Sequence, residues 1–326
     1  MISDNHNRPS CAKVSNSLQD VSIILVTYNS YRYLDGCLGD LYNAIERGCE
    51  IIVIDNASTD ETVKILRERF PNLCLIESPM NLGFACAVNK AVELSTRKYI
   101  LLLNPDTIVS TDTIARLVEI FETKPSIGVL GPQLRGEDDA IQHSCITFPK
   151  PWEVWVVHVF PYLKPFFRQR IYEFFDCQST IECDAVSGAC FLTTREIYAV
   201  AGGLDPRFFM YAEEMDFCYR VRKMGYSVHF TADVWIRHFI AKSTQHNPSL
   251  GMIYYHKSQL LYYQKHFGRL AIVFSGLGLF TGAVLRCAIY SVFNSKKAPT
   301  FQGLFVWYLK RIADFRGIKN YVWNNR

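Results

Sequence analysis

The first 135 residues alternate between two patterns of hydrophobic positions. Short, nearly continuous apolar runs rich in branched side chains are typical of strands buried on both faces of a parallel sheet. Between them, apolar residues recur every three or four positions, which indicates helices with one buried face. The runs lie at residues 21–28, 50–54, 74–76, 99–103 and 127–130, and the helical spacing at 34–45, 63–70, 84–92 and 114–121. This alternation predicts an α/β domain with a doubly wound, mostly parallel sheet.

After about residue 135 the alternation is lost. Residues 184–193 still predict a strand and residues 212–224 a helix, whereas residues 148–175 are dense in aromatic side chains with basic residues among them. This aromatic block fits either packing within the domain or contact with a membrane surface. We expect a flexible tail at 1–20, one half of the α/β domain at 21–135, its second half at 136–250, and a helical region at 251–326.

The last quarter of the chain contains its longest apolar stretch. Residues 270–285 carry no charge, Arg286 interrupts the run, and it then continues to residue 293. A spanning helix needs roughly 20 apolar residues, so a membrane helix and a buried core helix both stay open. Basic residues beside aromatic ones further on suit an anionic membrane surface, and we expect such a contact. The basic residues are Lys310, Arg311, Arg316, Lys319 and Arg326, against one acid, Asp314.

Composition narrows the class of protein. The 35 Lys and Arg against 31 Asp and Glu give a net charge of +4, too small a bias to indicate nucleic-acid binding. The 11 cysteines include no C-x-x-C pair, which argues against a disulfide framework or a zinc knuckle and for a reducing compartment. The first 20 residues lack the apolar core of a secretory signal. We therefore expect a cytoplasmic protein, peripheral on the cytoplasmic face of the cell membrane.

Polar residues follow four of the predicted strands. Ligands of open parallel sheets bind beyond the carboxyl ends of the strands, so these residues are candidates for one site. Turn preferences alone would explain any single one of them, and Ser58 with Glu61 also predicts a helix capping box. Four such ends at one edge favour a binding site. The residues concerned are Thr27, Tyr28 and Asn29, then Asp55 to Asp60, then Asn81 to Phe84, and finally Asn104 to Asp106.

The glycine pattern argues against three common sites: the Rossmann dinucleotide site, the P-loop and the nucleophile elbow of hydrolases. The chain has no G-x-G-x-x-G after the first strand, no P-loop sequence and no G-x-S-x-G elbow. A nucleoside diphosphate could instead be held through a metal ion. Mg²⁺ typically takes one or two carboxylates together with phosphate oxygens, and Asp106 after a buried strand is a suitable carboxylate.

Several of these segments together resemble glycosyltransferase family 2, whose members have the GT-A fold. The segments are residues 21–29 (VSIILVTYN), 54–60 (IDNASTD), 81–89 (NLGFACAVN), 102–106 (LLNPD), 188–189 (GA), 202–220 (GGLDPRFFMYAEEMDFCYR) and 238–243 (HFIAKS). Each motif alone is weak, but their order and spacing over residues 20–245 are specific. The sequence is similar to bacterial rhamnosyltransferase-like members that build surface polysaccharides.

The resemblance implies a donor site with a metal. By position, Asp55 would contact the nucleobase, and Thr27, Tyr28 and Asn29 would line the base and ribose pocket. Asn81, Gly83 and Phe84 would lie in the loop near the sugar nucleotide, with Gly83 allowing close backbone approach. Asn104 and Asp106 take the place of a D-x-D element. Asp106 would hold Mg²⁺ or Mn²⁺, and His238 would complete the metal shell.

The resemblance also places the catalytic base at Glu213 to Asp216. The family usually has Glu-Asp where this chain has Glu213-Glu214, one methylene longer, so the base stays open between the two, with Glu214 preferred. Asp216 would lie one turn further and orient the helix start or Arg220. Taken alone, these acids would also suit a helix N-terminus, where the helix dipole favours them.

The implied reaction is transfer of a sugar, with L-rhamnose as one candidate, from a dTDP- or UDP-sugar with inversion. The acceptor would be a hydroxyl of a saccharide or a lipid-linked saccharide, bound by residues 136–250, while residues 21–135 would bind the nucleotide sugar. A rival hypothesis is a sugar nucleotidyltransferase, but these need a glycine-rich, arginine-containing loop after the first strand, and residues 27–33 contain no glycine. The other rival is a non-catalytic nucleotide-binding or membrane scaffold, against which Asp106 and Glu214 argue.

Overall fold

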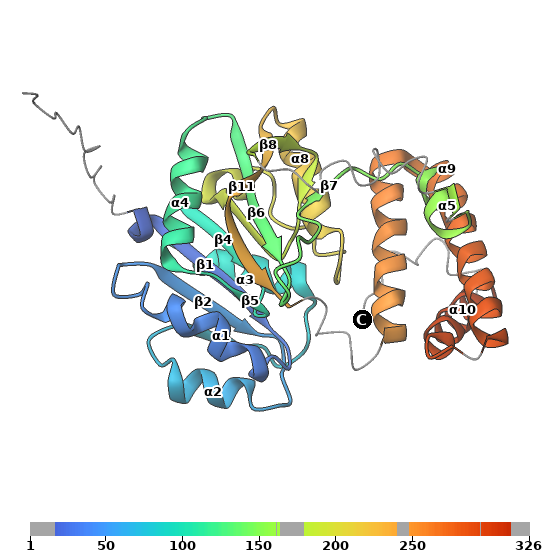
Figure 1. Cartoon of the computed structure of the whole chain (residues 1–326), viewed down its shortest axis with the longest axis horizontal. Helices are drawn as coiled ribbons and strands as arrows, with labels where there is room; N and C mark the ends of the chain where they lie inside the picture. Colours follow the sequence, from blue (N-terminus) through green and yellow to red (C-terminus); the bar gives the residue numbers. More distant parts are fainter. Residues whose placement is uncertain (1–16, 161, 164–178, 240–247, 294, 314–326) are drawn as a thin grey trace, which may run out of the picture.

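The computed structural model describes residues 17–160, 162–163, 179–239, 248–293 and 295–313. Its centre is a nine-stranded sheet with the order β3-β2-β1-β4-β10-β6-β11-β5, in which β8 also pairs with β11 (Figure 1). The first four strands confirm the sequence pattern and run parallel. They are β1 (Val21–Thr27), β2 (Glu50–Asp55), β3 (Cys74–Glu77) and β4 (Tyr99–Leu103).

Helices cover both faces of this sheet, as the alternation predicts. On one face, Ile23 and Leu25 of β1 belong to a core shared with α1, α2 and α4. On the other face, Ile24 and Val26 pack in a core with α3 and α8. The helices are α1 (Tyr31–Tyr42), α2 (Thr62–Arg69), α3 (Phe84–Leu94), α4 (Thr111–Glu122), α7 (Arg195–Val200) and α8 (Glu213–Lys223).

The second half of the domain adds strands of both directions to the same sheet. β10 (Cys190–Thr194) lies between β4 and β6 (Ile127–Arg135) and is antiparallel to both, whereas β11 (Ser227–His238) is parallel to β6. The sheet is therefore mixed beyond β4. The short strands β5 (Thr107–Ile108) and β8 (Ile181–Cys183) pair with β11 in the antiparallel direction.

Three local expectations need correction. The strand expected at 184–193 is broken at residues 187–189, because β9 (Ala185–Val186) leaves the main sheet to pair with β7 (Cys145–Ile146). The capping box is wrong: Ser58 bonds to Asp55, and Glu61 occupies the N-cap of α2 without a side-chain bond. Residues 17–20 of the expected tail form a 3-10 helix, and residues 1–16 lie outside the described residues.

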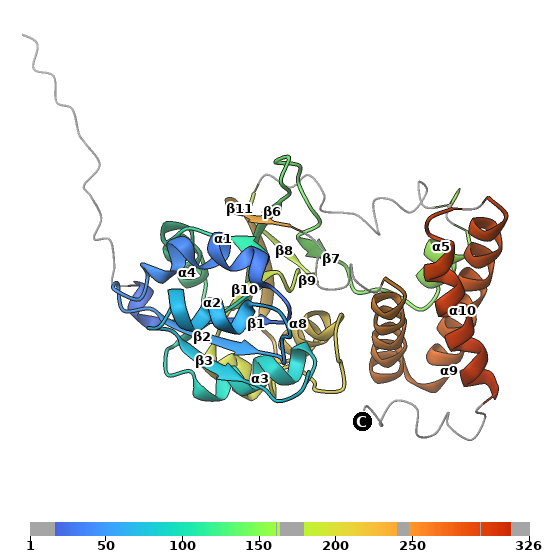
Figure 2. The ribbon, with the colours of Figure 1, turned by 90° about the horizontal axis from the view of Figure 1, so that it is seen from below.

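The C-terminal region is helical, as expected. α9 (Pro248–Val292) is bent at Gly268, whose φ of +83° suits a glycine, and α5 (Glu153–His158) and α10 (Ala298–Ala313) pack against it. These helices stand beside the α/β body (Figure 2). We call residues 248–267 the first arm of α9 and residues 269–292 its second arm. The aromatic block continues into residues 161 and 164–175, and the basic tail into 314–326, which both lie outside the described residues.

Candidate active site

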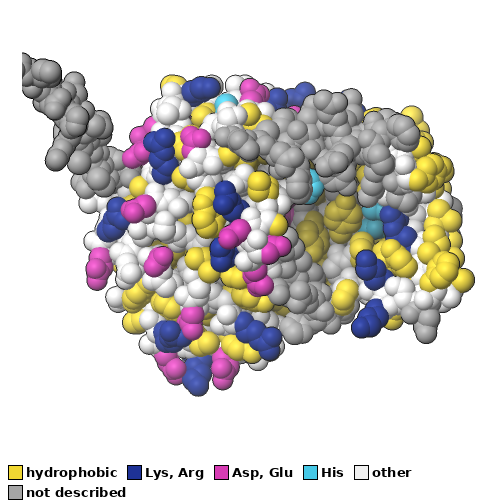
Figure 3. Space-filling model, in the orientation of Figure 1, with side chains coloured by type: hydrophobic (Ala, Val, Ile, Leu, Met, Phe, Trp, Pro, Cys, Tyr) yellow, Lys and Arg dark blue, Asp and Glu magenta, His cyan; other side chains and the backbone are white. Residues whose placement is uncertain are grey.

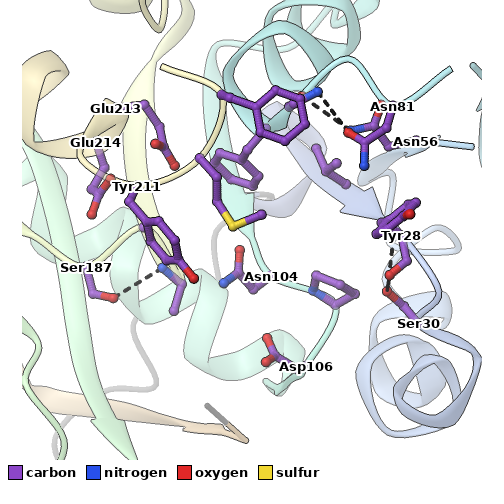
Figure 4. Close-up of a pocket in the computed structure, with 18 of the residues that line it drawn as sticks. Tyr28, Ser30, Asn56, Asn81, Asn104, Asp106, Ser187, Tyr211, Glu213 and Glu214 are labelled. Atoms are coloured by element: carbon purple, nitrogen blue, oxygen red, sulfur yellow. Dashed lines mark hydrogen bonds between the residues drawn. The ribbon is translucent and has the colours of Figure 1, made fainter. Parts of the chain in front are cut away.

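A cavity of about 320 Å³ opens at the carboxyl ends of β1 and β4 and extends to the N-terminus of α8 (Figure 4). Its walls come from segments far apart in the sequence. Nine of the side chains or backbones predicted to form the site line it: Tyr28, Asn81, Gly83, Phe84, Asn104, Asp106, Glu213, Glu214 and His238. Thr27, Asn29, Asp55 and Asp216 are not among its lining residues. The structure thus brings nine of the predicted residues to one cavity and leaves the other four outside its lining.

Asp55 and Thr27 are buried and do not line the cavity. The Asp55 side chain belongs to a residue only 2% exposed, and its carboxylate accepts hydrogen bonds from Thr27 Oγ1 at 3.0 Å and from the Ser58 amide at 2.9 Å. Asn29, with φ of +52°, accepts a bond from the Thr59 amide at 2.8 Å. These contacts hold the loops after β1 and β2 together. The nucleobase contact predicted for Asp55 stays a prediction.

Asn56 organises the next loop and had no role in the sequence prediction. Its amide donates to Asn81 Oδ1 at 2.9 Å and to the Gly83 carbonyl at 3.3 Å, and its oxygen accepts from the Leu82 amide at 2.8 Å. The side chain of Asn56 thus both donates to and accepts from this loop, as the backbone of a neighbouring strand would, and it holds residues 81–83 in place. Asn56 lies within the motif at 54–60, so this motif was the sequence feature that could have pointed to it.

Gly83 permits a close backbone approach to Phe209. A Cβ at this position would lie 2.7 Å from both the carbonyl oxygen and a ring carbon of Phe209, and the φ of Gly83 is +80°. The next residue, Phe84, donates its amide to the Phe209 carbonyl at 2.7 Å. Gly83 therefore brings the two halves of the domain together beside the cavity, which it also lines, and its approach to the sugar nucleotide stays a prediction.

Asp106 and His238 lie next to each other in the cavity lining because β5 pairs with β11. The register puts His238 opposite Thr107, and the Asp106 carbonyl accepts a bond from the Phe239 amide at 2.9 Å. His238 Nε2 then lies 3.6 Å from the Asp106 carboxylate. This pair joins residues that are far apart in the sequence.

Gln142 sets the tautomer of His238. The Gln142 amide nitrogen donates to the His238 carbonyl at 2.8 Å, so its oxygen accepts from His238 Nδ1 at 2.9 Å. Burial lowers the pKa of His238, and the charge of Asp106 only partly opposes this. The imidazole is therefore neutral near pH 7, and Nε2 turns a lone pair toward the Asp106 carboxylate.

Two lone pairs that face each other at this distance fit a divalent cation. Ligands bound at right angles around an ion at about 2.1 Å lie about 3 Å apart, which is close to the distance between the Asp106 and His238 atoms. Within the described part of the chain, no cluster of three His, Cys, Asp or Glu could hold a metal. An ion here would thus take further ligands from phosphate oxygens and water, and Asn104 lies nearby in the cavity (Figure 4).

The two glutamates enter the cavity from the first turn of α8. Tyr211 and Ala212, immediately before it, have φ of +74° and +66°, a conformation that costs energy for residues other than glycine. This turn aims Glu213 and Glu214 into the cavity side by side (Figure 4). Glu214 lies over the backbone of Gly188, where a Cβ would be 3.5 Å from its carboxyl carbon.

The two carboxyls differ in their surroundings. Burial, followed by the charge of Glu214, raises the pKa of Glu213 well above its usual value, and one Glu213 oxygen has no hydrogen-bond partner among the described residues. Burial raises the pKa of Glu214 to about 6, with backbone amides opposing the shift. At pH 7 Glu214 is therefore mostly ionised, whereas burial favours the protonated form of Glu213.

The glycosyl transferase family 2 model matches residues 22–192, just over half of the chain. The chain belongs to glycosyl transferase family 2. The matched range contains β1 to β4 and ends within β10, so it includes the Asp106 side of the cavity and excludes the glutamates.

Relatives of this family 2 glycosyltransferase extend the match into the second half. An N-acetylglucosaminyl-diphospho-decaprenol L-rhamnosyltransferase of Mycobacterium tuberculosis is 28% identical over 256 residues, 74% of this chain and 82% of the relative. The low-salt glycan biosynthesis hexosyltransferase Agl10 of Haloferax volcanii is 25% identical over 224 residues, 67% of this chain and 66% of the relative.

Two solved structures share the fold. The mannosyltransferase PcManGT from Pyrobaculum calidifontis, in complex with GDP-Man and Mn²⁺, has a TM-score of 0.54 at 19% identity and covers 93% of this chain and 84% of its own. GalNAc-T7 with UDP, GalNAc and Mn²⁺ has a TM-score of 0.56 at 14% identity, over 77% of this chain and 48% of its own. The fold of the family 2 chain is thus of the GT-A type expected from its sequence.

Asp216 serves a different part of this glycosyltransferase. Its buried carboxylate accepts from Arg220 Nε at 2.9 Å, as the sequence led us to expect, and also from Lys265 at 2.7 Å and His266 at 2.8 Å. Lys265 and His266 belong to the first arm of α9. The contacts make Asp216 a junction between α8 and α9, and a catalytic role for it stays a prediction.

Several further cavity residues, for which the sequence predicted no role, come from irregular backbone. Ser187 and Ala189 lie in the break between β9 and β10, and Phe209, Met210 and Tyr211 precede α8. Breaks in strands and strained turns have no periodic signature, so only the motifs at 188–189 and 202–220 pointed to this wall.

Proposed function

We propose that this enzyme transfers a sugar, with L-rhamnose as the first candidate, from a dTDP- or UDP-sugar to a saccharide on a lipid diphosphate. The observation that carries the proposal is one cavity in which the Asp106–His238 pair and the Glu214 carboxylate approach from separate walls. Direct transfer from a nucleotide donor to a hydroxyl acceptor can use these two kinds of group, one for the leaving diphosphate and one for the acceptor proton. The mycobacterial relative is an N-acetylglucosaminyl-diphospho-decaprenol L-rhamnosyltransferase matched over most of both chains, which supports the sugar and the lipid acceptor.

Asp106 and His238 are the residues that would hold Mg²⁺ or Mn²⁺. Such an ion, when bound, neutralises the diphosphate leaving group. Asn104 and Tyr28 line the same cavity and would orient the donor beside this pair. Two fold neighbours were solved with Mn²⁺ and a nucleotide or nucleotide sugar, which supports the assignment.

Glu214 is the proposed general base. A carboxylate with a pKa of about 6 is mostly ionised at neutral pH yet basic enough to accept a proton from an attacking hydroxyl. Direct attack with one base needs no covalent intermediate and inverts the anomeric centre. Protonated Glu213 beside it would donate a hydrogen bond to the acceptor.

In this proposal, residues 21–135 carry the donor site and residues 136–250 the acceptor side. The C-terminal helices would hold the enzyme on the cytoplasmic face of the membrane, where a lipid-linked acceptor is available. Among the described residues, α9 is the one helix long and apolar enough to cross a membrane.

Nucleotide binding tests the donor site. We expect dTDP or UDP with Mn²⁺ to raise the melting temperature of the full chain, because ligand at about 100 times its Kd stabilises a protein by about 2.7 kcal/mol. Asp106→Ala should remove the metal-dependent part of the shift, and Glu214→Gln should keep it. The absence of a shift with every nucleotide would favour the non-catalytic scaffold instead.

A further inference from the structure

A second cavity, of about 600 Å³, lies between the two arms of α9, the end of α5 and the start of α10. Met252 and Tyr255 of the first arm line one side, and Phe301 of α10 lines another. Hydrophobic side chains border the hollow between the α/β body and the C-terminal helices, with a histidine and basic side chains beside them (Figure 3). The cavity is thus mainly apolar and has the character of a site for hydrocarbon.

This second cavity adjoins the catalytic one. Tyr211 lines both, and it stands two residues before Glu213. The Tyr211 and Tyr255 rings lie 6.2 Å apart, edge to face, at the boundary. A ligand in the second cavity therefore ends beside the wall that carries the proposed base.

Arg286 supplies one positive charge to the apolar cavity. Three of its five N–H groups are directed at carbonyls: Nη1 donates to His158 at 2.6 Å and to Gly282 at 3.3 Å, and Nη2 to Val157 at 3.1 Å. Among the described residues, no carboxylate pairs with Arg286. Its other two N–H groups, one of which is Nε–H, have no hydrogen-bond acceptor among these residues. A half-buried guanidinium with spare donors is suited to a phosphate.

We propose that this cavity binds the prenyl diphosphate of the acceptor, with a phosphate on Arg286 and the first isoprene units among Met252, Tyr255 and Phe301. The proposal rests on the proposed function and adds the place of the acceptor lipid. In a saccharide linked to a lipid diphosphate, the sugar is bonded directly to the diphosphate. A phosphate at Arg286 would therefore direct that sugar past Tyr211 toward Glu214.

The test is calorimetric titration of the full chain in a non-ionic detergent with farnesyl diphosphate. EDTA is present, so that the Asp106–His238 pair cannot hold the diphosphate through a metal. We expect Arg286→Ala and the cavity-filling Ala283→Phe each to raise Kd at least tenfold. Arg269→Ala and Ala288→Phe, exposed positions of the same helix outside the cavity lining, should stay within twofold of the wild type.

Two further measurements complete the test. Because Arg286 also holds the end of α5, Arg286→Lys provides a second test if the alanine variant does not fold, and we expect its Kd to be intermediate. Farnesol and phosphatidylglycerol should compete at least tenfold more weakly than farnesyl diphosphate. Equal Kd values in the wild type and all folded cavity variants, or equal competition by the phospholipid, would overturn the site.

Steady-state transfer separates this proposal from the function on which it rests. We expect Arg286→Ala to raise KM for a prenyl-diphosphate acceptor and to leave KM for the donor unchanged. If transfer to that acceptor proceeds at wild-type efficiency in the cavity variants, the function stands and the site is overturned. If farnesyl diphosphate binds through Arg286 but no sugar is transferred to any such acceptor, the site stands and the proposed function fails.

Discussion

Glu213 and Glu214 are adjacent in sequence but differ in exposure, and this difference sets their protonation. Glu213 is almost fully buried, with one carboxyl oxygen unpaired among the described residues, whereas Glu214 is partly exposed in the cavity. The less buried carboxyl keeps the lower pKa and can give up its proton at neutral pH. Burial therefore supports Glu214 as the proposed base, in agreement with the preference that the resemblance gave.

Replacement of Glu214 by glutamine tests this assignment. Because general base catalysis contributes about 10²–10⁴-fold, we expect kcat to fall at least a hundredfold with little change in donor binding. The wild-type kcat/KM should fall tenfold per pH unit below about pH 6, where Glu214 becomes protonated. Asp112→Asn, an exposed acid on α4, is a control that should leave the rate unchanged. Full activity in the Glu214 variant would assign the base elsewhere.

Gly83 gives a second test at the scale of one residue. Gly83→Ala places a methyl group 2.7 Å from Phe209 at a positive φ, so we expect a loss of about 1–3 kcal/mol in the free energy of unfolding. Gly39→Ala in α1 is the matched control, since nothing lies within 4 Å of its Cβ. It should be neutral or stabilising by up to about 1 kcal/mol. Urea unfolding of both variants measures the difference, and equal stabilities would contradict the close contact.

At the scale of elements, the site depends on how α8 is held. Asp216 at its first turn binds Arg220 of the same helix and Lys265 and His266 of α9. Burial alone would raise the pKa of Asp216, but the bond from His266 and the charges of Arg220 and Lys265 outweigh it, and the pKa is lowered. The ionised carboxylate therefore stabilises the joint between the body and the C-terminal helices at neutral pH.

Asp216→Asn should weaken this joint. Removal of one partner from a buried charge network costs about 3–5 kcal/mol, and we expect a loss near the lower end because asparagine keeps one acceptor. The contribution of Asp216 is present above its ordinary pKa and is lost as the pH falls through the lowered value. Urea unfolding at pH 7 measures the loss, and Asp233→Asn on β11 serves as the control. A loss below about 1 kcal/mol would contradict the role of Asp216 as a junction.

The elements also show how far the sequence could predict the structure. β1 to β4 and their helices follow from local periodicity, so their positions agree within a few residues. The pairing of β5 with β11 joins Asp106 to His238, 132 positions apart, and no local pattern specifies it; only the ordered motifs brought the two residues to one site. The break at 187–189 and the turn at Tyr211 depend on tertiary contacts, so periodicity does not predict the wall they form, and only the motifs at 188–189 and 202–220 pointed to it.

At the scale of the whole molecule, the second arm of α9 has one face packed and one face exposed. Gly278 and Gly282 lie close to Trp155 and His158 of α5, while Leu270 and Val273 on the outer face are 87% and 60% exposed. The 24 residues of this arm extend about 36 Å, compared with a hydrocarbon core of about 30 Å. Lys296 and Lys297 follow its end. An apolar face of this length with basic residues at one end suits a lipid surface.

Vesicle binding tests this surface. Burial of each large apolar side chain contributes about 1.5–3 kcal/mol, so the double variant Leu270→Asp and Val273→Asp should weaken binding at least tenfold. Val200→Asp, at a 70% exposed position of α7 on the body, should have no effect. Anionic vesicles should bind the wild type more tightly than neutral ones, and the difference should shrink in high salt. Co-sedimentation unaffected by the double variant would contradict a membrane contact through α9.

The central claim is that one cavity combines a metal-dependent donor site with a single carboxylate base. Its most direct test is transfer from dTDP-L-rhamnose to N-acetylglucosaminyl-diphospho-polyprenol by the full chain, with the anomeric configuration of the product determined by NMR. We expect transfer that requires Mg²⁺ or Mn²⁺ and a product with the configuration opposite to that of the donor. Retained configuration, or transfer that persists in EDTA, would contradict the account.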